Sequence, residues 1–205
     1  PTMSPPLTGQ AQQSFDQLER LLGSRDEEHL WQGCALVEAL IDDAGMRAAV
    51  ETLMDGSEVD ACGHVVPGVR LEALVSVRQE AVCLRLLRAQ GALDGVRCLR
   101  VRDLHADTAM AVLSGLEALE SLTISSEAIE RVAGLVALPA LRSLELLHCA
   151  RLRVLELSAL PGLASLVVRG CSSLSEVSLT ALDGLKSLTL KRCGGMSALP
   201  ELDGL

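Results

Sequence analysis

Cysteine and histidine are the residues of this sequence that could bind a metal ion or act as nucleophile and base. The four histidines are spread over separate segments, and none lies in an H-E-x-x-H or H-x-x-x-H pattern, which places two ligands on one helix face. No C-x-x-C pair exists, and Cys62-x-His64 has no matching second half, whereas a tetrahedral zinc site needs four converging ligands. The sequence therefore predicts no metal site and no cofactor.

The motifs of common catalytic sites are also absent from the sequence. It contains no G-x-S-x-G nucleophile elbow, no G-x-x-x-x-G-K-[ST] phosphate loop and no G-x-G-x-x-G dinucleotide motif. A Ser/His/Asp or Cys/His assembly stays open at this point, because its members meet in space and leave no motif in the sequence. From the motifs we predict a protein that is not an enzyme and has no catalytic residues.

The seven cysteines favour a reducing compartment. Their number is odd, and their spacing is not that of the disulfide framework of a small secreted protein. The first residues lack the basic and apolar regions of a secretory signal, and no apolar run reaches the roughly 18 to 20 residues of a transmembrane helix. We therefore expect a cytoplasmic protein that does not bind a membrane.

Charge is distributed unevenly along the chain. Residues 1–69 carry twelve acidic side chains and three arginines, whereas residues 70–205 carry fifteen acidic and fifteen basic side chains. An acidic surface repels the phosphates of nucleic acids, so we expect no nucleic-acid partner for the N-terminal part.

The acidic part of the chain predicts an N-terminal α-helical cap over residues 14–68. Residues 1–13, which are rich in proline and glutamine, predict a disordered leader. Ser14 and Ser24 each precede a Gln or Glu by three residues, the spacing of a capping box at a helix start. The expected helices cover residues 15–22, 26–43 and 46–54, and residues 55–68 form an irregular connector.

From residue 69 the pattern changes to that of a strand. Valine, leucine and alanine alternate with polar or small residues from Val69 to Val77, which is typical of a strand with one buried face. Residues 78–90 then have a helical pattern that ends at Gly91, and Val96 begins another strand. This strand–helix–strand passage predicts the start of a repeat array.

Leucines recur at a nearly constant interval along this array. Each lies in L-x-x-L-x-L or a close variant, such as Leu119-x-x-Leu122-x-Ile124, and the last intervals are 22 residues. Because only 1% of the chain is aromatic, the core is expected to consist of stacked aliphatic layers. The central positions are Leu74, Leu99, Leu122, Leu144, Leu166 and Leu188.

The pattern resembles the leucine-rich repeat, whose signature is L-x-x-L-x-L-x-x-N/C-x-L at a period of about 20 to 29 residues. The resemblance covers about residues 70–205. It implies an α/β fold, a leucine-rich-repeat solenoid of about six repeats over residues 69–205 with a parallel front sheet. The nested half-repeat of 11 residues is typical of bacterial members of the family.

The half-repeat predicts a second wall of the solenoid. Leu155, Val177 and Leu199 lie midway between successive front-strand leucines and are expected to form this back wall. The earlier stretches "SVRQEAVCLRLLRAQ" and "DTAMAVLSGL" have helical spacing. We therefore expect the convex side to change from helix to extended chain along the array.

Three cysteines occupy the N/C position of the repeat: Cys149, Cys171 and Cys193. The resemblance implies that side chains at this position turn inward and lie beside loop backbone. Buried cysteines usually behave as small, inert apolar side chains. We therefore expect a structural role for these residues and no redox or metal ladder.

The exposed front face is the predicted binding site. In a strand, side chains that alternate with the core leucines point outward. One outward column is all serine over four coils, and two others carry charged and aliphatic side chains. With almost no aromatics, arginine and aliphatic residues must supply any binding hot spot. The predicted contacts to a partner protein of acidic or mixed charge are Arg100, Arg102, Glu145, Leu147, Val167, Arg169 and Lys191.

The leading interpretation is a non-catalytic protein-interaction module or scaffold, whose helical cap covers the apolar edge of the first coil. A second interpretation is the substrate-recognition part of a bacterial effector or ligase-like enzyme whose catalytic domain is absent from this chain. The final "LPELDGL", which is not a polar capping repeat, favours that alternative. In a third interpretation, the acidic helical cap binds the partner and the repeats only support it.

Overall fold

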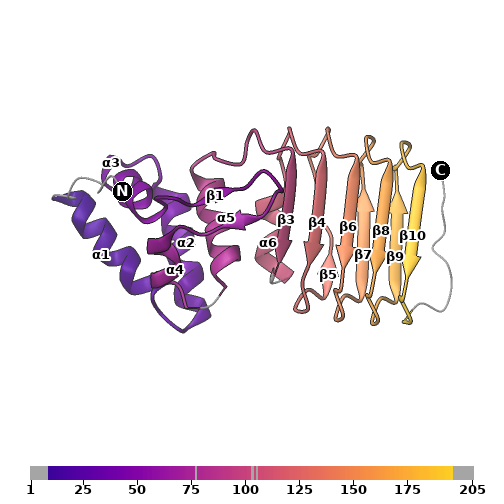
Figure 1. Cartoon of the computed structure of the whole chain (residues 1–205), viewed down its shortest axis with the longest axis horizontal. Helices are drawn as coiled ribbons and strands as arrows, with labels where there is room; N and C mark the ends of the chain where they lie inside the picture. Colours follow the sequence, from indigo (N-terminus) through magenta and orange to yellow (C-terminus); the bar gives the residue numbers. More distant parts are fainter. Residues whose placement is uncertain (1–8, 77, 103, 105, 196–205) are drawn as a thin grey trace. The chain divides into compact units, whose positions relative to one another are not determined.

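The computed structural model covers the 205-residue chain and describes residues 9–76, 78–102, 104 and 106–195, with the backbone alone for residues 106–109 (Figure 1). The chain divides into two compact units. The helical unit comprises the residues up to 58 together with residues 65–92, and the solenoid unit comprises residues 59–64 and those from 93 onward.

The helical unit is built from five helices around an aliphatic core. Two of its helices begin at an aspartate: the side chain of Asp26 accepts a hydrogen bond from the Glu28 N–H, and that of Asp43 accepts one from the Met46 N–H, each at 2.9 Å. These caps satisfy N–H groups that a helix start leaves without partners. The helices are α1 (Gln10–Leu22), α2 (Glu27–Leu40), α3 (Ala44–Leu53), α4 (Val69–Leu74) and α5 (Gln79–Ala89).

The predicted helix starts differ from the observed ones. Ser14 lies inside α1, because residues 10–13, expected in the disordered leader, already form its first turn, while residues 1–8 lie outside the described residues. Ser24 accepts a hydrogen bond from the Asp26 N–H and contacts His29 Nδ1, so it supports the turn before α2 without capping the helix. Neither serine therefore forms the predicted capping box.

The predicted strand at residues 69–77 is wrong, because residues 69–74 form helix α4. The Glu72 N–H donates to the Gly68 carbonyl and the Val75 N–H to the Leu71 carbonyl, both at 2.9 Å. Leu71 and Val75 are both fully buried, whereas Val69 is 81% exposed. The stretch fits both a period of two and the helical spacing of i, i+4, and packing inside the helical unit selects the helix.

The connector contains a short hairpin. Strands β1 (Glu58–Val59) and β2 (Val65–Val66) form a two-stranded sheet. The carboxylate of Asp60 closes the intervening turn by accepting hydrogen bonds from the N–H groups of Cys62, at 2.8 Å, and His64, at 2.9 Å. The predicted irregular connector is therefore partly ordered by backbone pairing.

The solenoid unit carries a parallel front sheet with the predicted register. Leu99 pairs with Leu122, which continues through Leu144 and Leu166 to Leu188. The sheet has five described strands where six repeats were expected, because Leu74 belongs to helix α4. The strands are β3 (Cys98–Arg102), β4 (Ser121–Ser125), β6 (Ser143–Leu147), β8 (Ser165–Arg169) and β10 (Ser187–Lys191).

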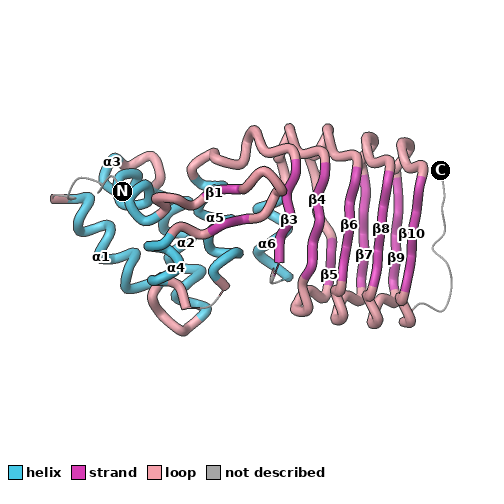
Figure 2. The backbone as a smooth tube through the Cα atoms, in the orientation of Figure 1, coloured by secondary structure: helices cyan, strands magenta, loops and turns pink. Residues whose placement is uncertain are grey.

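A second parallel sheet forms the back wall, and its strands alternate with the front strands along the array (Figure 2). Leu155 pairs with Val177 as predicted, and Leu199 lies outside the described residues. The helix α6 (Ala106–Leu113) precedes these strands, so the convex side does change from helix to extended chain. The back strands are β5 (Arg131–Val132), β7 (Val154–Ser158) and β9 (Glu176–Thr180).

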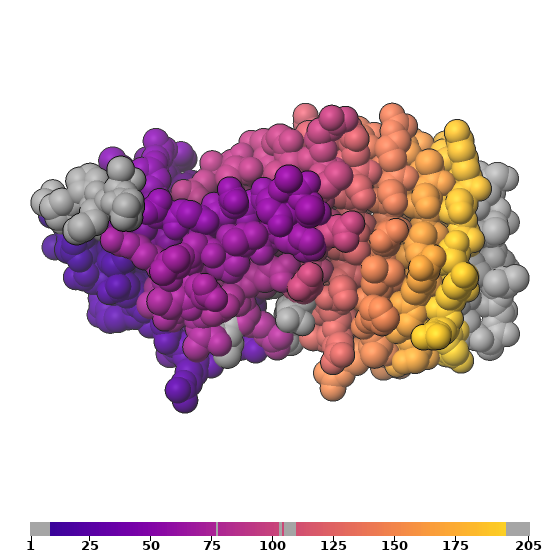
Figure 3. All heavy atoms as spheres, viewed as in Figure 1, coloured from indigo at the N-terminus to yellow at the C-terminus, as the bar shows by residue number. Residues whose placement is uncertain are grey.

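The turns of the solenoid show the half-repeat in the backbone itself. A residue with positive φ ends each wall segment at an interval of 11 residues, which reverses the chain between front and back. Only one of these residues is glycine. The positions are Ala137, His148, Ala159, Gly170, Ala181 and Arg192. The coils follow one another in sequence order as parallel bands in the space-filling view (Figure 3).

Candidate functional site

The seven predicted contact residues form a front strip: Arg100, Arg102, Glu145, Leu147, Val167, Arg169 and Lys191. All seven lie on strands of the front sheet, and on β3, β6 and β8 they alternate with buried residues, whereas Lys191 on β10 follows the half-buried Leu190. The sheet arranges them in two rows, one through Glu145 and Val167 and one through Leu147, Arg169 and Lys191. The predicted outward orientation of these side chains is therefore consistent with the burial patterns of β3, β6 and β8.

The structure brings five members of the front strip together and separates two. Glu145, Leu147, Val167, Arg169 and Lys191 lie on three successive strands, spaced by about 4.8 Å. Arg100 and Arg102 lie on β3, beyond the intervening strand β4, which contributes a nearly buried threonine and a half-buried serine to the two rows. The contiguous part of the strip therefore lies on β6, β8 and β10.

The contiguous part contains two cations side by side. Arg169 pairs directly with Lys191 in the parallel register, and both side chains are exposed. Like charges directly opposite each other on neighbouring strands destabilise a sheet. Among the described residues, neither cation has an acidic partner, whereas elsewhere in the solenoid Arg97 pairs with Glu120.

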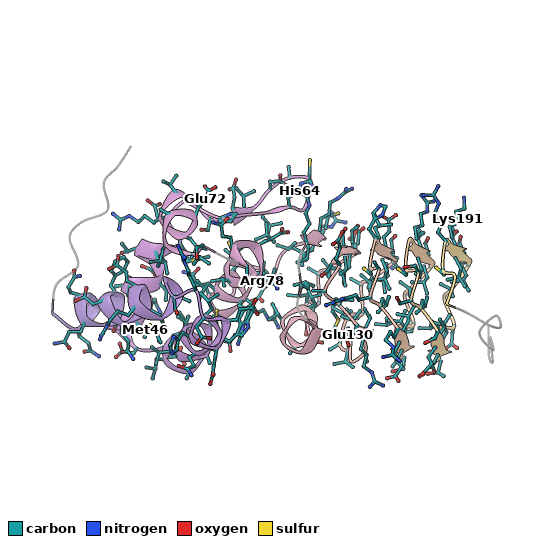
Figure 4. The ribbon with its side chains drawn as sticks, turned by 90° about the horizontal axis from the view of Figure 1, so that it is seen from below. Met46, His64, Glu72, Arg78, Glu130 and Lys191 are labelled. Carbon is teal, nitrogen blue, oxygen red and sulfur yellow. The ribbon has the colours of Figure 1, made fainter. Side chains whose placement is uncertain are left out.

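The turn after the front strands adds side chains that the strip did not include. His148 and Arg192 are exposed and lie in left-handed turn positions just beyond β6 and β10. The His148 N–H donates to the Arg169 carbonyl at 2.8 Å, which joins this turn to the neighbouring coil. Both residues follow a central leucine by four positions, and this spacing was the signal in the sequence that could have identified them. Figure 4 shows Lys191 at the margin of the last described coil.

The serine column has the geometry of a structural feature. Ser121, Ser143 and Ser165 occupy one row in register and are half-buried, while Ser187 on the end strand is exposed. Backbone hydrogen bonds at this row join each coil to the preceding one. The Ser143 N–H, for example, donates to the Glu120 carbonyl at 3.1 Å.

The cysteines at the N/C position are turned inward. The Cys149 sulfur lies 3.8 Å from the Ile124 carbonyl oxygen, and the Cys193 sulfur lies 3.7 Å from the Val168 carbonyl oxygen, in each case in the preceding coil. Hydrogen bonding to Cys149 and burial raise the pKa of Cys171 above its usual value. The same contact lowers the pKa of Cys149, but that side chain has no exposed surface, so access limits its reactivity.

Two further properties bear on the class of site. The described residues contain no group of three or more His, Cys, Asp or Glu side chains placed to hold a metal ion. Within the described ranges, no helix has both the length and the apolar composition needed to cross a membrane.

Comparison with known proteins gives no relative from which a function could be transferred. No family model, no curated protein and no solved structure matches the chain. The site therefore has to be interpreted from its own geometry.

Proposed function

We propose that the chain is a leucine-rich-repeat protein of the bacterial type and that its front strip binds another protein. The 22-residue coils, the aliphatic stack through Leu144 and Leu166, and the inward cysteine at the end of the front strand support the family assignment. Each is a feature of the L-x-x-L-x-L-x-x-N/C-x-L signature.

The observation that carries the binding proposal is the pairing of Arg169 with Lys191. Two exposed cations at about 4.8 Å strand spacing repel each other, and an acidic side chain of a partner would relieve that repulsion. Half-buried Leu147 and Val167 lie next to them and offer aliphatic surface. A parallel sheet holds these groups in fixed rows, so binding a partner costs little conformational entropy of the backbone.

The experiment is a parallel capture with two baits. The wild-type chain and the double variant Arg169→Glu, Lys191→Glu are used in cross-linking pull-downs, and the retained protein is then titrated against each. We expect cross-links to β6, β8 and β10, and a loss of affinity of at least about tenfold in the variant. Affinity of the wild type should also fall with added salt, because exposed charges are screened over about 8 to 10 Å.

A matched control separates this site from a general effect of charge. Arg151→Glu with Arg153→Glu changes the net charge by the same amount, at exposed positions before the back strand β7. This control should bind like the wild type. An unchanged affinity in the front-strip variant, with cross-links confined to residues 10–56, would instead assign binding to the helical unit and overturn the proposal.

A further inference from the structure

Strand β3 is the end strand of the front sheet, and the hairpin segment 59–64 contacts its edge opposite β4. This segment belongs to the solenoid unit, although it lies far from β3 in the sequence. The Arg100 N–H donates to the Gly63 carbonyl oxygen at 2.6 Å, and His64 forms a parallel bridge with Arg100. The end of the hairpin turn is therefore joined to the edge of the front sheet by a single backbone bridge.

This bridge brings the chain next to two exposed cysteines, one on each side of the contact. Cys62 precedes the bridged His64 by two residues and lies in the hairpin turn, and Cys98 precedes the bridged Arg100 by two residues and begins β3. Cys62 and Cys98 are both exposed, whereas the residue that follows each of them, Gly63 or Leu99, is buried. Both thiols therefore belong to the outer face, where Figure 4 shows His64 on the same side as Lys191.

The backbone of Gly63, the residue after Cys62, lies directly against the backbone of Cys98. Consecutive Cα atoms are about 3.8 Å apart, so Cys62 lies one residue from this contact, and a disulfide needs Cα atoms about 4.4 to 6.8 Å apart. A Cβ atom at Gly63 would lie 2.8 Å from the Cys98 carbonyl oxygen, so the approach is close and requires glycine. The two hydrogen bonds from the Cys62 and His64 N–H groups to Asp60 keep the turn in this position.

The other five cysteines differ from this pair in accessibility. Cys34, Cys83, Cys149 and Cys171 are buried, and Cys193 is half-buried. Burial raises the pKa of Cys34 and of Cys83 to about 12, which keeps both thiols protonated near neutral pH. A soluble oxidant therefore meets Cys62 and Cys98 first.

We propose that Cys62 and Cys98 are a redox site, at which a low-molecular-weight disulfide such as glutathione disulfide forms an intrachain disulfide that fastens segment 59–64 to β3. One cysteine loses its proton to solvent and its sulfur attacks glutathione disulfide, releasing the first glutathione thiolate. The second cysteine then loses its proton and displaces the second glutathione. Two protein S–H bonds are replaced by one S–S bond, while the oxidant is reduced to two molecules of glutathione.

The experiment treats the full chain with defined ratios of glutathione disulfide to glutathione, followed by acid quenching, alkylation and peptide mapping. We expect one Cys62–Cys98 disulfide that dithiothreitol reverses, with the four buried cysteines alkylated only after denaturation. The closed loop should raise Tm by about 5 to 10 °C. Hydrogen exchange of the Arg100 amide, which donates to Gly63, should slow by about tenfold or more.

The matched controls are Cys62→Ser and Cys98→Ser, each of which keeps one thiol of the pair. They should accumulate a mixed disulfide with glutathione and show no rise in Tm. Simultaneous glutathione adducts on both wild-type cysteines, or a disulfide joining any other pair, would overturn the proposal. So would a Cys62–Cys98 disulfide that leaves exchange of the Arg100 amide unchanged. None of these outcomes depends on whether the front strip binds a partner.

Discussion

The helical unit and the solenoid unit are both held together by aliphatic side chains, but their geometry is set in different ways. In the solenoid each coil repeats the positions of the previous one, so that Leu144 stacks on Leu122 and Leu166 on Leu144. In the helical unit each contact is individual, as at Gly33 of α2, where an added Cβ would lie 2.7 Å from a Leu22 methyl carbon. In a repeat array the sequence pattern therefore predicts which residues pair between coils. In a set of unlike helices the pattern does not predict which residues come into contact.

The largest expected effect tests the stack of the solenoid. Leu166→Ala removes a fully buried side chain from the middle of the front sheet and should cost about 2 to 5 kcal/mol of unfolding free energy. Leu188→Ala at the end strand, where the side chain is only half-buried, should cost clearly less. Urea unfolding of both variants measures the difference. Equal losses of unfolding free energy in the two variants would contradict the expectation that Leu166 contributes more to the core than Leu188.

The next effect tests the helix that replaced a predicted strand. Leu71→Ala should cost about 2 to 4 kcal/mol because Leu71 is fully buried, while Val69→Ala should change stability by less than about 0.5 kcal/mol because Val69 is 81% exposed. In a strand the two side chains would share one face and cost similar amounts. Thermal and urea unfolding of the two variants distinguish these cases, and similar losses would contradict helix α4.

A smaller effect tests how the helices of the helical unit begin. Asp43→Ala removes the side chain that accepts from the Met46 N–H and should cost about 1 kcal/mol. Ser14→Ala, inside α1, should be close to neutral, since alanine is a good helix former. The comparison of unfolding midpoints at equal m-value is the measurement. A larger loss at Ser14 would support the capping box expected from the sequence.

The smallest effect is a gain and tests the turns of the solenoid. Ala159 adopts a left-handed conformation with a φ of 55°, in which its Cβ is strained by about 1 to 2 kcal/mol. Ala159→Gly removes that strain but adds freedom to the unfolded chain, so we expect a net stabilisation of less than about 1 kcal/mol. Ala164→Gly, at a residue without positive φ, should destabilise instead. Calorimetric Tm values of both variants show the sign.

The candidate sites were predictable to different degrees. The outward rows of the front strip follow from the alternation of side chains and the 22-residue interval, and so does the pairing of Arg169 with Lys191. His148 and Arg192 recur at the same interval, but they lie in turns beyond the strands, so the alternation of strand side chains does not predict them. The proximity of Cys62 and Cys98 had no signal in the sequence, because the hairpin segment is not part of any repeat.

By itself, the sequence determined the period of the coils and the side chains that stack within them. Residues 22 positions apart have equivalent surroundings, so pairing of one strand in register requires the same pairing in the next. The tertiary structure alone decided that residues 69–74 form a helix and that Gly63 approaches the backbone of Cys98. The physical reason is that a short apolar stretch fits two periodicities and a hairpin fits many surfaces, so contacts with distant residues make the choice.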